Sequence, residues 1–469
     1  METKPTIDLS ALLERQRKAW SANPPDRAQR MADMAALREA VVRRMPDLVA
    51  AMQADFGHRS RHESLISDGV IVLQEIDHVR KHLRRWMRPK RRFADWLFWP
   101  ARTELQYRAV GVVGIISPWN YPVNLGLVPL VTAIAAGNHV MLKPSEYTPH
   151  TSRALTELFA DVFPPERVSV VEGDAELAAR FAALPFDHLF FTGSTAVGRK
   201  VMAAAAPNLT PLTLELGGKS PAIIAADYPI ETAAARIAAG KFFNAGQTCI
   251  APDYVLVPRA KRDALVDALR QCVERSYPDF SQNQDFTSII NEGHFNRLRG
   301  LVDEARAAGA RIISLPNDAA HDPARRRFAP TLVLDAPLDS RLMQEEIFGP
   351  VLPLVPYDDL DQALQLIAAL PRPLALYHFD HDRKRTRRVI AAQLAGGVNV
   401  NDCLLQFGQT HLPFGGIGPS GMGQYHGHAG FLAMSKQLPI MYQSRWPSWA
   451  LMRPPYGKLA ERLIGWLVR

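Results

Sequence analysis

Apolar residues follow two different patterns along the chain. Near the N-terminus they recur three and four positions apart, and over residues 27–56 this spacing predicts one long amphipathic helix. From residue 110 onward, short β-branched runs alternate with helical stretches. The runs predict strands at 110–116, 139–142, 168–171 and 188–191. The stretches between them predict one helix that ends at 136 and three more at 151–162, 175–182 and 195–206. This alternation predicts an α/β fold with a parallel, doubly wound sheet.

A second alternating block starts near residue 212. It predicts strands at 212–216, 254–257, 331–334 and 351–355, and helices at 230–244, 260–276 and 295–308. Residues 413–427 are rich in glycine and read as an irregular segment, and a tail follows from 431. The longest uncharged stretch, 109–142, is long enough to span a membrane, but its prolines and asparagines favour a strand–loop–helix–strand segment instead.

Composition narrows the class of protein. The 469 residues are 47% hydrophobic and 22% charged, which excludes a disordered or fibrous chain. Three cysteines exclude a disulfide framework and favour a reducing compartment, and the first ten residues lack the apolar core of a secretion signal, so we expect a cytoplasmic protein. The formal charge of +8 lies entirely in residues 80–92, which hold eight Lys or Arg and no acid. Trp86 and Met87 interrupt this basic run, so part of it is expected to pack.

Cys249 is the first candidate for covalent chemistry. It follows Gly246-Gln247-Thr248 at the end of a helical run, where a loop could expose a reactive thiolate. A lone cysteine is more often a small buried apolar residue, as the helical setting of Cys272 suggests, and Cys403 stays undecided. From the local sequence alone Cys249 is only slightly favoured as a nucleophile.

Glu215 is the second candidate. It lies in an apolar strand and precedes two glycines, and a buried carboxylate there would be costly unless it had a role. Desolvation would raise its pKa and suit it to general-base catalysis. A Glu facing water at a sheet edge explains the same pattern equally well.

Two strand ends suggest a nucleotide site. Gly193 and Ser194 join a predicted strand to a helix, where small residues let backbone N–H groups approach a phosphate; a tight turn with a serine N-cap is the alternative. Lys143 and Glu146 end another strand, where a carboxylate can bind ribose hydroxyls, although a solvated charge pair has the same pattern.

Two further patterns are set aside. Residues 416–421 match G-x-G-x-x-G, but no strand precedes them and Pro419 interrupts any helix, so they indicate a structured loop. His411, His426 and His428 lack the spaced Cys or carboxylate partners of a metal centre, so we expect no metal.

Seven short motifs stand in order along the chain: residues 116–122, 143–146, 191–195, 214–221, 246–249, 344–350 and 413–416. Taken together, they resemble the aldehyde dehydrogenase superfamily and stand in that family's order over essentially the whole chain except the last twenty or so residues. Residues 418–427 and the short N-terminus are similar to its class 3 branch, and residues 55–63, 245–254 and 372–376 resemble coniferyl aldehyde dehydrogenases.

The resemblance implies a role for each matching position. Cys249 would attack the aldehyde, Asn120 would stabilise the oxyanion, and Glu215 would activate the water that releases the acid. The coenzyme, NAD or NADP, would be held by the remaining residues. These are Trp119, Lys143, Glu146, Gly193, Ser194, Glu346 and Phe348.

The resemblance also implies an architecture: a Rossmann-type coenzyme domain, an α/β catalytic domain and a β oligomerisation arm, in a homodimer. The expected bounds are 1–90 and 109–217 for the coenzyme domain, 218–430 for the catalytic domain, 91–108 and 435–445 for the arm, and 446–469 for a C-terminal tail.

Three functions therefore compete. The first is oxidation of an aldehyde to its acid, with coniferaldehyde giving ferulate. The second is oxidation of medium- or long-chain aliphatic aldehydes. The third, of another class, is binding to membrane or nucleic acid through the basic run and the tail; the tail's amphipathic stripe suits a membrane surface, whereas a nucleic-acid partner is not expected.

Overall fold

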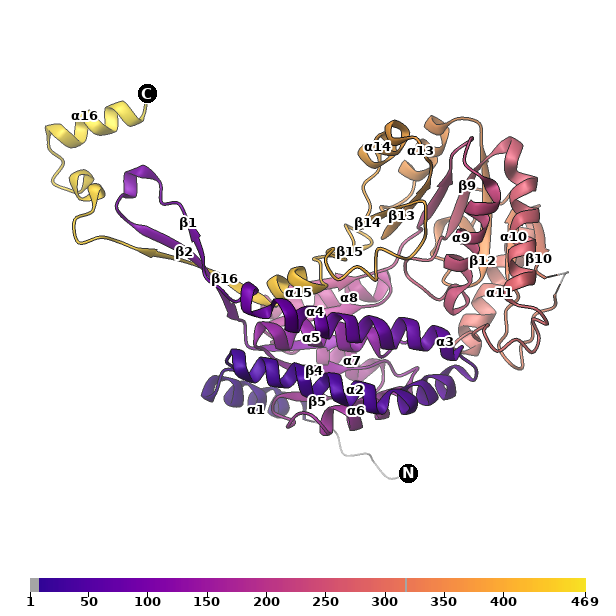
Figure 1. The fold of residues 1–469 in the computed structure, drawn as a ribbon, viewed down its shortest axis with the longest axis horizontal. Helices are drawn as coiled ribbons and strands as arrows, with labels where there is room; N and C mark the ends of the chain where they lie inside the picture. Colours follow the sequence, from indigo (N-terminus) through magenta and orange to yellow (C-terminus); the bar gives the residue numbers. More distant parts are fainter. Residues whose placement is uncertain (1–7, 317–318) are drawn as a thin grey trace.

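The long N-terminal helix forms where the apolar spacing predicts it. The structure, a computed structural model, describes residues 8–316 and 319–469. In it helix α2 spans Arg27–Phe56; the Asp26 side chain accepts a hydrogen bond from Gln29 N at its start, and Gly57, at φ +75°, ends it. With α1 (Leu9–Ala22) and α4 (Ile71–Trp86), it flanks the first of three sheets (Figure 1).

The first sheet has six strands in the order β15-β7-β6-β3-β4-β5. All are parallel except β15, and β3 has β4 on one side and β6 on the other. From β3 the strand order therefore runs outward in two directions, through β4 and β5 on one side and through β6 and β7 on the other. Open α/β sheets bind ligands at such a point, beyond the carboxyl ends of the strands. The strands are β3 (Val112–Ile116), β4 (His139–Lys143), β5 (Val168–Val170), β6 (His188–Thr192), β7 (Leu212–Glu215) and β15 (Gly421–Met422).

The second sheet has seven strands in the order β10-β11-β12-β9-β8-β13-β14 and is parallel apart from β10. Four of its strands, β8, β10, β13 and β14, were not among the sequence predictions. The strands are β8 (Pro221–Ile224), β9 (Tyr254–Pro258), β10 (Arg311–Ser314), β11 (Thr331–Leu334), β12 (Val351–Tyr357), β13 (Ala375–Phe379) and β14 (Gly397–Val400).

Helices cover both sheets. The uncharged stretch that could have suggested a membrane span folds into β3, the fully buried helix α5 (Asn124–Ala136) and β4, and no helix of the described residues is long and apolar enough to cross a membrane. The other α-helices are α3 (Arg61–Ser64), α6 (Pro149–Ala160), α7 (Ala175–Ala182), α8 (Thr195–Ala205), α9 (Ile230–Phe242), α10 (Arg262–Ser276), α11 (Glu292–Ala307), α12 (Arg341–Gln344), α13 (Leu360–Ala368), α14 (Arg383–Ala392) and α15 (Gly427–Ala433).

A third, three-stranded antiparallel sheet forms an arm that extends away from the two larger units (Figure 1). It consists of β1 (Lys90–Arg92), β2 (Arg102–Ala109) and β16 (Ser435–Tyr442), and the tail helix α16 (Lys458–Leu467) returns to its far end. There Trp96 and Trp466 pack edge to face, with ring centroids 5.9 Å apart. In the basic run Trp86 is only 3% exposed, which confirms that part of the run packs.

Candidate active site

The parallel strands of the first sheet bring most of the predicted site residues to one edge. Asn120 follows β3, Gly193 and Ser194 follow β6, and Glu215 ends β7. Because the carboxyl ends of neighbouring parallel strands meet at the same edge, residues almost a hundred positions apart face one cavity. This strand-end cavity has a volume of about 450 Å³.

The strand-end cavity brings together eight of the ten predicted site residues. Its walls contain Trp119, Asn120, Gly193, Ser194, Glu215, Cys249, Glu346 and Phe348. The other two, Lys143 and Glu146, pair with each other, with Lys143 Nζ 3.0 Å from Glu146 Oε2. Lys143 is buried at the end of β4, but neither residue is among those lining the cavity.

A second cavity of about 440 Å³, the apolar cavity, opens on the other side of Cys249. Cys249, Leu125 and Phe407 line both cavities. The apolar cavity is walled mainly by aliphatic and aromatic side chains from distant segments, with a few polar groups. The apolar and aromatic members include Ile66, Ile71, Tyr121, Phe243, Ile250, Leu404 and Leu405, and the charged and amide members are Asn124, Arg236, Asp402 and Gln409. The thiol therefore lies at the junction of a polar and an apolar space.

The Cys249 loop is held in an unusual backbone conformation. Asn244 and Ala245 have φ values of 51° and 52°, and Gly246 has φ 71°. A Cβ on Gly246 would lie 2.3 Å from Gly349 O, so the loop packs too closely for a side chain there. Gln247 anchors it further: Gln247 Nε2 donates to Ser288 O at 3.1 Å, and Ile290 N donates to Gln247 Oε1 at 3.0 Å.

A buried ion pair supports the segment that carries Asn120. Arg59 and Asp68 are fully buried and pair at 2.9 Å, and Arg59 also donates to Asn120 O at 2.7 Å. Asn120 Nδ2 donates to Gln247 O at 3.1 Å, which places this amide against the Cys249 loop. Sequence reasoning missed Arg59 and Asp68, because two opposite charges nine positions apart resemble an ordinary surface pair until the chain buries them beside Asn120.

Glu215 and the Cys249 thiol are both desolvated. Glu215 is 2% exposed and neither carboxyl oxygen has a hydrogen-bond partner among the described residues, so burial raises its pKa well above the ordinary value. Burial also raises the pKa of the Cys249 thiol, and the nearby carboxyls of Glu346 and Glu215 raise it further. The site thus holds proton-bearing groups that can exchange protons near the thiol.

Glu346 lies on the opposite wall. Burial raises its pKa to about 8, with Asp253 adding to the effect. Its Oε1, like Thr192 Oγ1, is buried and has no hydrogen-bond partner within residues 8–316 and 319–469. A Cβ on Gly217 would come within 2.0 Å of Glu346 Oε2, so the glycine makes room for the carboxyl. Trp119 packs against Phe348 beside it, with centroids 5.3 Å apart.

The lining residues that were not predicted include Thr192, His294, Arg297 and Tyr425. His294 packs on Trp119 with centroids 5.0 Å apart, and Arg297 donates to Glu346 O at 3.3 Å. His294 and Arg297 come from α11, whose sequence is an ordinary amphipathic pattern. Thr192 and Tyr425 lie within segments that the sequence analysis did single out, residues 191–195 and 413–427.

This fold and site define a class. Two α/β units place a cysteine where a cavity at parallel strand ends, suited to a nucleotide, meets an apolar cavity suited to a second small molecule. The model of the aldehyde dehydrogenase family matches residues 10–438, and the chain belongs to that family. It is an NAD(P)-dependent aldehyde dehydrogenase.

The relatives cover nearly the whole chain. A protein of Pseudomonas aeruginosa described as a probable coniferyl aldehyde dehydrogenase is 47% identical over 97% of this chain and 95% of its own length. The substrate-bound structure of Staphylococcus aureus AldH superimposes with a TM-score of 0.93 at 36% identity, covering 99% of this chain and 100% of that one. An aldehyde dehydrogenase of Mycobacterium tuberculosis complexed with NAD⁺ gives a TM-score of 0.83 at 28% identity, covering 92% and 90%. The predicted family and α/β fold are thereby confirmed.

Proposed function

We propose that the enzyme oxidises coniferaldehyde to ferulate with NAD or NADP as the electron acceptor. The observation that carries the proposal is the position of Cys249, which lines both cavities and so can meet an aldehyde from one side and a coenzyme from the other. The description of the Pseudomonas aeruginosa relative adds a substrate class.

The covalent step falls to Cys249. Its Sγ releases its proton to solvent, to which Cys249 is partly exposed, and forms a bond to the aldehyde carbon while the carbonyl π pair moves to oxygen. The Asn120 side-chain amide, aligned by the Arg59–Asp68 pair, and the Cys249 backbone N–H stabilise that oxyanion. Collapse of the oxyanion, with loss of hydride from the same carbon, leaves a thioester on Cys249.

The strand-end cavity fits a nicotinamide dinucleotide. Gly193 has no room for a side chain, since a Cβ would lie 2.5 Å from the Phe191 ring, and Ser194 caps the N-terminus of α8, where a phosphate is favoured. The unpartnered Oε1 of Glu346 is suited to a ribose hydroxyl, with Trp119 and Phe348 beside the nicotinamide. Lys143 and Glu146 would hold the adenosine ribose. The bound coenzyme supplies the acceptor for the hydride.

Glu215 completes the cycle. Its carboxylate takes a proton from a water molecule, the resulting hydroxide attacks the thioester carbon, and the thiolate of Cys249 leaves as ferulate forms. Burial raises the pKa of Glu215, which makes its carboxylate a stronger base than an exposed Glu. A carboxylate at this position supports release of the free acid.

The walls of the apolar cavity support an aromatic aldehyde with a polar end. Tyr121 and Phe243 offer ring faces, whereas Arg236, Asp402 and Gln409 could meet the phenol and methoxy oxygens. A long alkyl aldehyde would leave these polar groups without partners, which costs binding free energy.

A substrate panel tests the proposal. Purified enzyme is incubated with NAD and then NADP, and with coniferaldehyde, benzaldehyde, hexanal or dodecanal, while reduced coenzyme is followed by absorbance. We expect kcat/KM to be highest for coniferaldehyde. Turnover confined to long alkyl aldehydes would contradict coniferaldehyde as the substrate and support a fatty-aldehyde dehydrogenase.

We further infer a cytoplasmic homodimer with the domain bounds 1–90 and 109–217, 218–430, and 91–108 with 435–445. An arm that projects from the body with exposed apolar residues such as Met441 and Tyr442 supports pairing with a second copy. Light scattering after size exclusion should give twice the 52.1 kDa chain mass.

The tail retains a second candidate role at a membrane surface, since Leu459, Trp466 and Val468 are exposed. Full-length protein should then sediment with anionic vesicles more than protein truncated before Leu459.

A further inference from the structure

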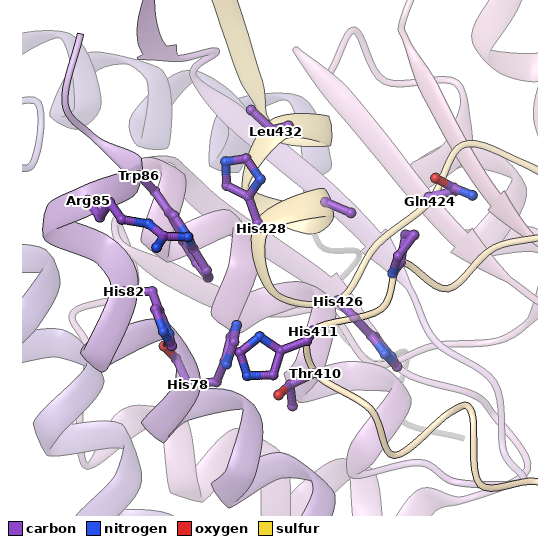
Figure 2. A pocket seen from close by; sticks show the side chains of 12 residues that line it. His78, His82, Arg85, Trp86, Thr410, His411, Gln424, His426, His428 and Leu432 are labelled. Carbon is purple, nitrogen blue, oxygen red and sulfur yellow. Dashed lines mark hydrogen bonds between the residues drawn. The ribbon is translucent and has the colours of Figure 1, made fainter. Parts of the chain in front are cut away.

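A third cavity lies outside the catalytic site, between α4, residues 410–413, Gln424 and α15. Its volume is about 640 Å³, larger than either catalytic cavity. Figure 2 shows that side chains from these segments converge on it. Five of the lining residues are histidines, and the others include Arg85, Trp86 and Gln424. The histidines are His78, His82, His411, His426 and His428.

Three of these histidines form a cluster across two segments. The ring centroids of His78 lie 4.4 Å from those of both His82 and His411, and His82 and His411 are 5.7 Å apart. His78 and His82 share one face of α4, since they are one turn apart, and His82 stacks on Trp86 at 5.9 Å. The cluster is therefore a built feature of the helix face and not a chance meeting of surface side chains.

The charge of the lining has one sign. Arg85 is the permanent cation, and no Asp or Glu is among the lining residues. A neutral imidazole has one N–H, and His82 directs its Nδ1 to His78 O at 2.8 Å, so the imidazole donors left for a ligand are those of the other histidines. The nearby carboxyls are engaged elsewhere: Glu75 accepts a hydrogen bond from Gly427 N at 2.7 Å, and Asp77 pairs with Arg38 and Arg80. The cavity thus offers donors and positive charge with no competing carboxylate.

A buried polar atom in the cavity wall also lacks a partner. His426 is 3% exposed, and its Nε2 has no hydrogen-bond partner among the described residues. Its ring is fixed between Phe407 and Phe414, with centroids 4.8 and 5.4 Å away. Because this Nε2 has almost no accessible surface, His426 forms a rigid part of the wall, and the donors that a ligand can meet come from the other lining side chains.

The arrangement favours an organic anion over a metal ion. Among the described residues, no group of three or more His, Cys, Asp or Glu is arranged to hold a metal ion. Trp86, Pro413 and Leu432 add apolar wall beside the donors, which suits a flat apolar group. We propose that this cavity binds a small organic anion with a planar ring, its carboxylate at Arg85 and the histidine cluster and its ring against the apolar wall.

The site is separate from the catalytic cavities, yet it adjoins them. Phe407 lines both catalytic cavities and packs on His426, which lines this one. An aromatic acid could therefore bind on both sides of the same phenylalanine, and the experiment has to separate the two.

Titration calorimetry of the full chain with cinnamate tests the proposal. The test variant is Arg85→Gln with His411→Asn, which removes the proposed anion partners. The matched control is Arg84→Gln with His62→Asn, which changes the same residue types at exposed positions outside the cavity. Phe243→Leu serves as the marker of binding in the apolar catalytic cavity. Turnover of an aldehyde without cinnamate shows that each variant is folded.

We expect a class of cinnamate sites whose Kd rises about tenfold or more in the test variant, because a charge-assisted hydrogen bond is lost. The same class should be unchanged in the control and in Phe243→Leu. Phosphate and cinnamyl alcohol should bind more weakly than cinnamate. Equal cinnamate binding by wild type, test and control variants, or its absence from all three, would overturn the proposal. Phosphate binding as tightly would overturn ring recognition, and cinnamyl alcohol binding as tightly would overturn anion recognition.

Discussion

The two cavities that meet at Cys249 are built in opposite ways. The strand-end cavity is made from residues at the carboxyl ends of parallel strands and from two carboxyls, Glu215 and Glu346. Both oxygens of Glu215 and the Oε1 of Glu346 are buried without a hydrogen-bond partner among the described residues. The apolar cavity is made from ring and aliphatic side chains on the π-helical turn Leu65–Val70, on α9 and on the irregular segment 402–409. The strand-end cavity therefore holds fixed titratable groups, whereas the apolar cavity can select a substrate mainly by the shape of its walls.

The difference indicates where chemistry and specificity reside. Groups that must move protons or orient charge gain most from a rigid scaffold that holds them desolvated, as the strand ends do. A wall that only has to match the outline of a substrate can sit on loops, where residues change without disturbing the sheet. Substitutions on the two sides should consequently alter different kinetic constants.

The largest expected effect comes from the atom that both cavities share. Replacing Cys249 by Ala removes the proposed nucleophile, and aldehyde oxidation should fall on the order of a thousandfold or more. Reduced coenzyme formation measures this loss. Cys272→Ala is the control, because that thiol is buried in α10 away from both cavities. Retained oxidation in the Cys249 variant would remove the covalent mechanism.

Glu215→Gln should leave thioester formation and block its hydrolysis. A burst of about one reduced coenzyme per site should then be followed by turnover slowed on the order of 10²- to 10⁴-fold. Because burial raises the pKa of Glu215, its carboxyl holds a proton at lower pH and cannot accept one from water, so wild-type hydrolysis should rise with pH until the group ionises. The variant should lose that rise in the steady state. Glu231→Gln, an exposed change at the start of α9, should keep it.

The polar side of the comparison was largely predictable from sequence. Strand–helix alternation locates the carboxyl ends of strands, and Asn120, Gly193, Ser194 and Glu215 follow or end such strands. Short apolar strands such as β13 were missed because five buried residues do not show a period that separates a strand from a helix. Lys143 and Glu146 were placed at the correct strand end, yet they lie outside the cavity wall.

The apolar side could not be predicted in the same way. Its walls combine Ile66, Phe243 and Leu405, which are far apart in the chain and meet only through packing. No local pattern marks such residues, since each one alone resembles ordinary core or surface. The third cavity, lined by five histidines, could not be predicted for the same reason. His78 and His82 lie on one helix, but the histidine cluster forms only where His411, from a distant segment, contacts them.

A smaller effect is expected at the coenzyme wall. Glu346→Gln keeps the shape and replaces one carboxyl oxygen by an amide N–H₂, which weakens the proposed hydrogen bond to a ribose hydroxyl, so the coenzyme KM should rise by about tenfold while the aldehyde KM changes little. Initial rates at varied coenzyme and saturating aldehyde measure this. The control is Glu304→Gln, at an exposed carboxylate on α11 that pairs with Arg341 of α12; it should leave both constants as they are. A rise confined to the aldehyde KM would mean that Glu346 contacts the aldehyde and not the coenzyme, which would contradict its proposed role.

The smallest effect should come from the wall of the apolar cavity. There a substitution should raise the KM for the aldehyde and leave the KM for the coenzyme unchanged, the opposite of the result expected for Glu346→Gln. Phe243 lines only the apolar cavity, where it stacks on Tyr121 at 6.4 Å. Phe243→Leu keeps much of the buried volume and removes the ring face, worth about 1 kcal/mol for an aromatic pair, so the KM for coniferaldehyde should rise by about fivefold. The KM for hexanal should change less, because an alkyl chain gains little from a ring face, and the coenzyme KM should not change. Equal shifts for both aldehydes would mean that the wall senses volume alone and that the aromatic preference arises elsewhere in the cavity.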